Sequence, residues 1–140
     1  MKTEIEGIKI YNHPNFCEEL KEFINKHCPS ADLEQTMDTA MNLIFQKAFK
    51  NIECITRKNF GKADNFEGYP VYFLKLMLTG GGLEKSQNPK SYLILDIVNK
   101  YMGFLCLDSH IQNYKDSELR KMAKKRTKEL LEYIHEIDYK

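Results

Sequence analysis

Two nearly uninterrupted apolar runs, residues 71–79 (VYFLKLMLT) and 91–99 (SYLILDIVN), constrain the fold of this chain most strongly. Each run is far shorter than the roughly 20 residues of a membrane span and has the length of a strand that is covered on both faces. Residues 103–109 (GFLCLDS) follow closely enough to form a hairpin with the second run. The chain is therefore expected to build a sheet with buried central strands.

Helical periodicity replaces this pattern near both ends of the chain. Apolar residues there recur three and four positions apart, which is typical of helices with one buried side. Asn15 and Glu18 have the spacing of a capping box at the start of the first helix. In the last helix the apolar stripe is interrupted at Arg126 and Thr127. The first expected helix opens at Pro14 and Asn15 and is stopped by Pro29. The other two span residues 31–50 and 116–137.

The order of the elements predicts an α+β fold. The strands follow one another instead of alternating with helices, so we expect a mostly antiparallel sheet of four to five strands. Two N-terminal helices and one C-terminal helix should pack against it. Shorter strands are expected at residues 3–11 and 52–56, with a loop at 57–69. A length of 140 residues fits a single domain, residues 1–140.

Composition excludes several classes of protein. No stretch longer than eight residues lacks a charged side chain, so a membrane span is not expected. The first residues, MKTEIEG, do not resemble a signal peptide. Four cysteines without a C-x-x-C pair are expected to be small buried hydrophobes. These features predict a cytoplasmic protein, and the excess of lysine over arginine suggests the AT-rich coding of a low-GC bacterium or its mobile elements.

Charge is distributed unevenly along the chain. Residues 1–55 hold six basic and nine acidic groups, whereas residues 56–140 hold fifteen basic and eleven acidic ones. Six basic residues cluster early in the last helix, where the helix dipole disfavours positive charge. An anionic partner such as nucleic acid would explain this order, and the alternative is an ordinary solvated helix face. The six are Arg120, Lys121, Lys124, Lys125, Arg126 and Lys128.

The segment 57–69 carries a second group of basic residues. Arg57, Lys58 and Lys62 alternate there with aromatic residues that include Phe60. Unpaired bases can stack on aromatic rings while lysines bind the phosphates. The alternative is that the aromatic side chains anchor a loop to the core. Together with the last helix, this segment predicts nucleic-acid binding as the second candidate function.

Acidic residues gather in the first two helices. An acidic surface can dock a basic protein and block its active site. We therefore expect a non-enzymatic interaction protein, first of all an inhibitor or immunity-type module, without a cofactor. A protein partner is slightly favoured over nucleic acid, because a net charge of +1 is poor for general phosphate binding. The candidate contact residues are Glu18, Glu19, Glu22, Glu34 and Asp38.

The last hairpin supplies one enzymatic hypothesis, a metal-dependent nuclease or hydrolase. If a three-residue turn at 100–102 joins the strands, Asp96, Asp108 and His110 share one face, about 7–8 Å apart. Such a group could hold a divalent cation and activate water. A two-residue turn would separate the two carboxylates onto opposite faces. The simpler interpretation is that Asp108 ends its strand, in which case the chain has no catalytic residue or metal ligand here.

Overall fold

A computed structural model describes residues 3–50, 60–66, 68–78, 88–108 and 116–138. Six strands form one open sheet in the order β1-β2-β6-β5-β4-β3. Neighbouring strands are antiparallel, except that β2 and β6 are parallel. The predicted α+β class is confirmed, with one strand more than expected. The strands are β1 (Glu4–Ile5), β2 (Ile8–Ile10), β3 (Phe60–Phe66), β4 (Tyr69–Lys75), β5 (Lys90–Asp96) and β6 (Tyr101–Asp108).

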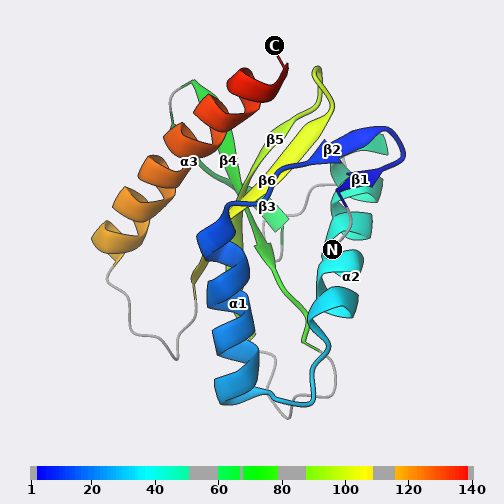
Figure 1. Ribbon diagram of the computed structural model, residues 1–140, viewed down its shortest axis with the longest axis vertical. Coiled ribbons are helices and arrows are strands. Elements are labelled where there is room, and N and C mark those ends of the chain that lie inside the picture. The colour runs from blue at the N-terminus through cyan, green and yellow to red at the C-terminus, as the bar shows by residue number, and fades with distance from the viewer. Residues whose placement is uncertain (1–2, 51–59, 67, 79–87, 109–115, 139–140) are drawn as a thin grey trace.

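Helices cover both faces of this sheet (Figure 1). On one face lie α1 (Pro14–His27) and α2 (Leu33–Ile44), and α2 continues into the π-helical segment η1 (Phe45–Lys50). On the other face lies α3 (Asp116–Asp138). The two N-terminal helices and the C-terminal helix were thus predicted correctly.

The start of α1 differs from the prediction. Its N-cap is His13 and not Asn15, because the Nδ1 atom of His13 accepts a hydrogen bond from the Asn15 backbone nitrogen at 3.2 Å. Pro14 follows as the first helical residue, a position that proline favours because no backbone donor is needed there. The predicted capping box of Asn15 and Glu18 is therefore wrong.

The apolar runs form the central strands because both of their faces are buried. In β5, Leu93 and Leu95 pack into the core beneath α1 and α2, whereas Ile94 packs beneath α3. Gly103 of β6 lets the backbone of Tyr11 and the side chain of Leu130 lie close against this strand. A Cβ atom at position 103 would meet the Tyr11 carbonyl oxygen and the side chain of Leu130.

The segment predicted as a loop at 57–69 is largely a strand. Residues 60–66 form β3, which pairs with β4 and places Phe60 opposite Leu74. Gly68, with φ of +80°, lies in the tight connection between these strands, where glycine avoids the strain of a left-handed backbone. The expected strand at 52–56 lies outside the described residues.

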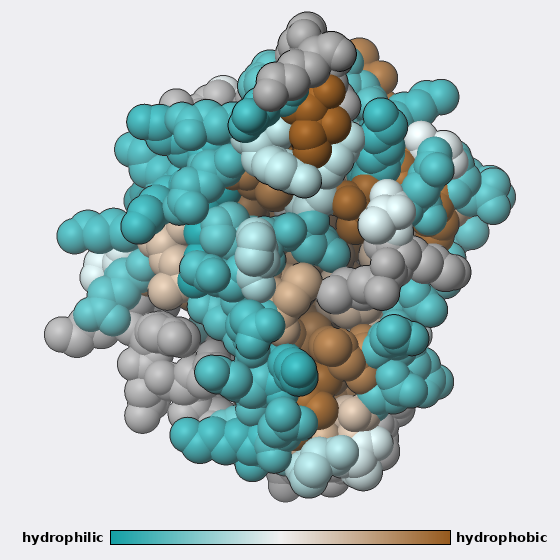
Figure 2. Space-filling view, in the orientation of Figure 1, coloured by the Kyte–Doolittle hydropathy of each residue, from teal (hydrophilic) through white to brown (hydrophobic). Residues whose placement is uncertain are grey.

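The surface is largely polar around the helices. Figure 2 shows hydrophilic side chains over most of the visible surface of α1 and α3, with hydrophobic surface between α1 and α2. In the described part of the chain, no helix has both the length and the apolar character that crossing a membrane requires.

Candidate functional site

Arg126, a predicted anion-binding residue of α3, is buried in an ion pair. Its exposed fraction is 7%, and its two terminal nitrogens donate to the two carboxylate oxygens of Glu19 in α1, at 2.7 and 2.8 Å. The Nη1 atom also donates to the carbonyl oxygen of Leu105 at 3.0 Å. The predicted surface roles of Arg126 and Glu19 are therefore wrong, because each residue neutralises the other.

This ion pair explains the interruption in the apolar stripe of the last helix. Burial by itself lowers the pKa of the Arg126 guanidinium, but the hydrogen bond and the charge of Glu19 outweigh it and raise the pKa above its usual value. The adjacent Thr127 is fully buried and donates its hydroxyl to the Ala123 carbonyl at 2.8 Å. Both buried polar side chains are thus hydrogen-bonded, as a core requires.

The other basic residues of α3 are exposed. Arg120, Lys124 and Lys128 are four positions apart and therefore line one side of the helix. Lys121 and Lys125 lie beside them, and the four lysines form no ion pair with any described residue. These five residues are called the basic side of α3 below. Their positive charge is concentrated in the N-terminal half of the helix.

Lys124, in the middle of the basic side of α3, points away from α1. Tyr133 lies on the α1 side, where it lines a cavity together with Asn12 and His13. Lys124 precedes Tyr133 by nine residues, which is about two and a half helical turns, so the two side chains project in opposite directions. In the sheet, β2 lies on one side of β6, and β5 and β4 lie on the other. Lys124 therefore projects toward the side of β5 and β4.

Two contacts show which residues of β6 lie beside the basic side of α3. Leu130 lies against Gly103, and Arg126 binds the carbonyl of Leu105. Moving toward the N-terminus of α3 thus corresponds to moving toward the C-terminus of β6. The basic side of α3 is consequently level with residues 106–108 and with the β5 residues that pair with them.

Four partly exposed side chains lie at this level on the same face as α3. Ile94 packs beneath α3, so Tyr92 and Lys90, two and four positions before it, share its face. Phe73 of β4 lies opposite Tyr92, and Lys75 lies opposite Lys90. The Nζ atom of Lys90 is 5.3 Å from the centre of the Phe73 ring. These four residues are called the sheet patch.

The cover that α3 gives to this face ends between Val71 and Phe73 of β4. Val71 is fully buried in the cluster that contains the apolar residues of α3, whereas Phe73, two positions later on the same face, is partly exposed. Tyr92, opposite Phe73, packs against the edge of that cluster and is also partly exposed. The basic side of α3 and the sheet patch therefore bring positive charge and two aromatic rings to the same face of the sheet.

In the described part of the predicted basic and aromatic segment at 57–69, Phe60 and Lys62 do not extend this surface. Phe60 is 2% exposed and belongs to the core beneath α1 and α2. Lys62 is exposed, but it pairs with Tyr72, which packs against that same core, so Lys62 lies on the face opposite α3. Arg57 and Lys58 lie outside the described residues. Phe60 and Lys62 thus share the face of β3 that lies opposite α3.

The predicted acidic surface is reduced by the loss of Glu19 to the ion pair. Lys21 is exposed on the same helix and interrupts the remaining negative charge. Asp38 is partly buried, and the other three residues are exposed. The remaining acidic candidates are Glu18, Glu22, Glu34 and Asp38.

The hairpin register predicted for a metal site is wrong. Asp96 lies opposite Tyr101, and its carboxylate accepts hydrogen bonds from the backbone and side-chain nitrogens of Asn99, both at 2.9 Å. Asp108 lies opposite Lys90, six residues along β5, so the two carboxylates are about 20 Å apart along the strands. A connection of four residues and an irregularity in β6 shift the register.

No metal site replaces the predicted one among the residues that the structure describes, since no group of three His, Cys, Asp or Glu residues could hold an ion. His110 lies outside these residues. Asp96 instead stabilises the hairpin connection.

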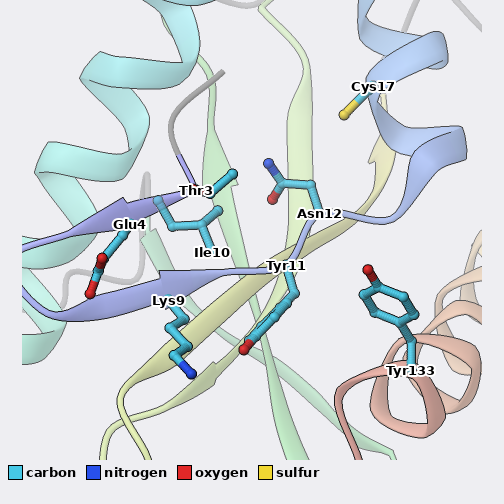
Figure 3. A pocket seen from close by; sticks show the side chains of 8 residues that line it. All are labelled: Thr3, Glu4, Lys9, Ile10, Tyr11, Asn12, Cys17 and Tyr133. Atoms are coloured by element: carbon cyan, nitrogen blue, oxygen red, sulfur yellow. The ribbon is translucent and has the colours of Figure 1, made fainter. Parts of the chain in front are cut away.

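Two neighbouring cavities lie on the other side of α3, against β2 and the start of α1. The larger has a volume of about 540 Å³, and Figure 3 shows Tyr133 reaching it from α3, Cys17 from α1 and Lys9 from β2. The second, of about 490 Å³, is lined in part by His13 and Glu129. The Nε2 atom of His13 is 3.4 Å from Glu129, and its Nδ1 atom caps α1.

The thiol beside these cavities is not activated. Burial, together with the negative charge of Glu18, raises the pKa of Cys17 above its usual value, so the thiol stays protonated at neutral pH. The predicted burial of cysteines is confirmed for Cys28 and Cys106, whereas Cys17 is only partly buried. Cys54 lies outside the described residues.

Sequence reasoning missed the sheet patch. Phe73 and Lys75 are two positions apart, as are Lys90 and Tyr92, and this alternation indicates a shared face. The surrounding apolar residues hid the signal, because a run that is nearly all apolar predicts two covered faces.

Comparison of the chain with protein-family models, with curated proteins and with solved structures finds no match.

Proposed function

We propose that this chain is a non-enzymatic binding protein whose partner is nucleic acid. The observation that carries this proposal is the exposed cluster of five basic residues on one half of α3, which continues onto the lysines of the sheet patch. Arg120, Lys124 and Lys128 are spaced along the helix as a row of phosphate contacts requires.

Local stability does not account for this arrangement of charge. Positive residues near a helix N-terminus oppose the helix dipole, at a cost of about 0.3–1 kcal/mol each. Lys75 and Lys90 are direct neighbours across β4 and β5, and like charges in that position destabilise a sheet. Asp108, on the other side of Lys90, offsets only part of this charge. Neutralisation by phosphate groups would turn the unfavourable charge into binding free energy.

The net charge of +1 does not oppose this function. The negative charges of Glu18, Glu22 and Glu34 belong to α1 and α2 on the opposite face of the sheet, and Glu19 is neutralised by Arg126. Exposed charges interact over roughly 10 Å at 0.1 M salt, so a local cluster determines phosphate binding more than the net charge does.

Charge reversal on α3 tests the proposal. Binding of labelled DNA and RNA strands of roughly 20 nucleotides should weaken steeply with salt. Lys124→Glu with Lys128→Glu should lower the affinity at low salt at least about tenfold and reduce the slope of log K against log salt by about 1.4, the value for two lost phosphate contacts.

The matched control is Lys21→Glu with Lys26→Glu, which reverses two exposed charges on α1. This variant should bind nearly as wild type. Equal losses in both variants, or no binding by the wild type, would contradict the proposal.

The second candidate is a protein-binding module, such as an inhibitor or immunity-type protein. The exposure of Glu18 and Glu22, one turn apart on α1, supports it. Glu18→Lys with Glu22→Lys should then release a basic protein partner captured from the native host, while the melting temperature stays unchanged. Retention of the same partner would contradict this candidate.

A further inference from the structure

We infer that the sheet patch takes the bases of single-stranded nucleic acid, with Phe73 and Tyr92 each stacking on one unpaired base. This inference rests on the proposed function and adds the class of nucleic acid. It identifies β4 and β5 as the floor of the binding surface and the basic side of α3 as one of its walls.

The two rings lie where consecutive nucleotides can reach them. Phe73 and Tyr92 are directly opposite each other on adjacent antiparallel strands, so their Cβ atoms are about 4.5–5.5 Å apart. Both side chains are partly exposed at the edge of the surface that α3 covers. Each of the four bases has a flat aromatic face that can stack on a Phe or Tyr ring, so this contact requires no particular nucleotide sequence.

Lysines surround the rings where the phosphates of a stacked strand would lie. Lys90 already contacts the Phe73 ring through its Nζ atom, and Lys75 is its cross-strand neighbour. On the other side, Lys124 of α3 projects toward β5 and β4. A nucleic-acid strand lying between Lys75 and Lys90 on one side and Lys124 on the other would stack its bases on the two rings and place its phosphates near the lysines.

A duplex does not fit this arrangement. Its bases are paired and stacked inside the helix, so Phe73 and Tyr92 could contact only sugar and phosphate. A folded protein partner would gain nothing from the lysine pair unless its surface were acidic. The combination of aromatic floor and basic wall is therefore most complementary to unpaired nucleotides.

Competition among three polyanions tests this inference. The probes are single strands of about 12 nucleotides, in DNA and RNA forms, the corresponding duplex, and polyphosphate of equal charge, each measured by fluorescence anisotropy. We expect either single strand to bind about tenfold or more tightly than the duplex and the polyphosphate. The stronger of the DNA and RNA strands identifies the natural source of the bases.

Variants separate stacking from electrostatics. Phe73→Leu and Tyr92→Leu keep apolar bulk but lose the ring, and each should weaken single-strand binding about tenfold while leaving polyphosphate binding within about twofold. Tyr92→Phe keeps the ring and should bind as wild type. Retained polyphosphate binding by the two leucine variants excludes loss of folding as the cause. Tyr133→Leu, at an exposed aromatic residue on the opposite side of α3, is the matched control and should have no effect.

Photocrosslinking provides a second measurement that does not depend on variants. A strand containing 5-iodouridine should crosslink to peptides that contain Phe73 or Tyr92. Equal binding of duplex and single strand, with no effect of Phe73→Leu, would overturn this inference and leave the proposed function intact. Failure of the wild type to bind any of the three probes would overturn both.

Discussion

Arg126 of α3 and Glu19 of α1 form a bidentate ion pair, although they are 107 positions apart in the chain. It joins the helix on one face of the sheet to a helix on the other face, past the edge of β6. The same guanidinium satisfies the carbonyl of Leu105, a residue that has no partner in β5 because the register shifts there. This residue of the basic cluster therefore serves the fold, and only the exposed residues around it belong to the proposed binding surface.

Removal of one partner of this ion pair should destabilise the protein. Arg126→Met leaves the Glu19 carboxylate in a mostly buried position, and we expect a loss of about 3 kcal/mol in the free energy of unfolding. The double variant Arg126→Met with Glu19→Leu should recover most of the loss, since no unpaired charge remains. Urea unfolding measures both values. Lys125→Met, at an exposed neighbour, should change stability by less than about 0.5 kcal/mol, and an equally small effect of Arg126→Met would refute a structural role for the ion pair.

Gly103 should tolerate no side chain. A Cβ atom at this position meets the backbone oxygen of Tyr11, which cannot rotate away, and the side chain of Leu130. Gly103→Ala should therefore cost about 3 kcal/mol. Gly7→Ala is the comparison: its Cβ atom meets nothing within 4 Å, and only the φ of +82° opposes the substitution, at about 1 kcal/mol. Similar losses in both variants would show that β6 and the β2–α1 connection are not closely packed.

The stability of the protein should fall at alkaline pH because of Cys106. Burial raises the pKa of this thiol from 9.0 to about 12, so the folded state binds its proton more tightly than the unfolded state does. The resulting stabilisation is complete below pH 9 and is lost as pH rises toward 12, at up to about 1.4 kcal/mol per pH unit. The stability difference between wild type and Cys106→Ala should therefore shrink between pH 9 and 10. A constant difference would mean that water reaches the thiol.

Asp96 should stabilise its hairpin without binding a metal. Asp96→Ala removes two hydrogen bonds with Asn99 and should lower the free energy of unfolding by about 1 kcal/mol. Millimolar Mg²⁺ or Mn²⁺ should leave the melting temperature of the wild type unchanged. If the metal raised the melting temperature of the wild type but not that of Asp96→Ala, the result would show that Asp96 binds a metal ion.

The sequence predicted the fold well where its patterns are local. The apolar runs identified β4, β5 and β6, and the helical spacing identified three helices, because both patterns follow from periodicity within one element. The segment containing Phe60 was missed as a strand because its glycine and charged residues are typical of loops. Its partner, β4, supplies the packing that makes it a strand.

The candidate site could be predicted only in part for the same physical reason. The exposed lysines of α3 are adjacent in the sequence, so their cluster was visible there. The neutralisation of Arg126 by Glu19 depends on a contact between distant segments. The sheet patch depends on strand register, which brings Phe73 next to Tyr92. Asp96 and Asp108 are separated because the hairpin connection begins directly after Asp96, which places Asp96 opposite Tyr101 and Asp108 opposite Lys90.

Chemical-shift mapping would locate bound nucleic acid on the surface of the protein. A ¹⁵N-labelled sample should be titrated with a short single strand and its amide signals followed. We expect the largest shifts at Phe73, Lys90 and Tyr92 in the sheet and at Lys124 and Lys128 in α3, while the signals of Glu18 and Glu22 of α1 stay unchanged. Shifts confined to α1, or no shifts at millimolar strand concentration and low salt, would contradict it.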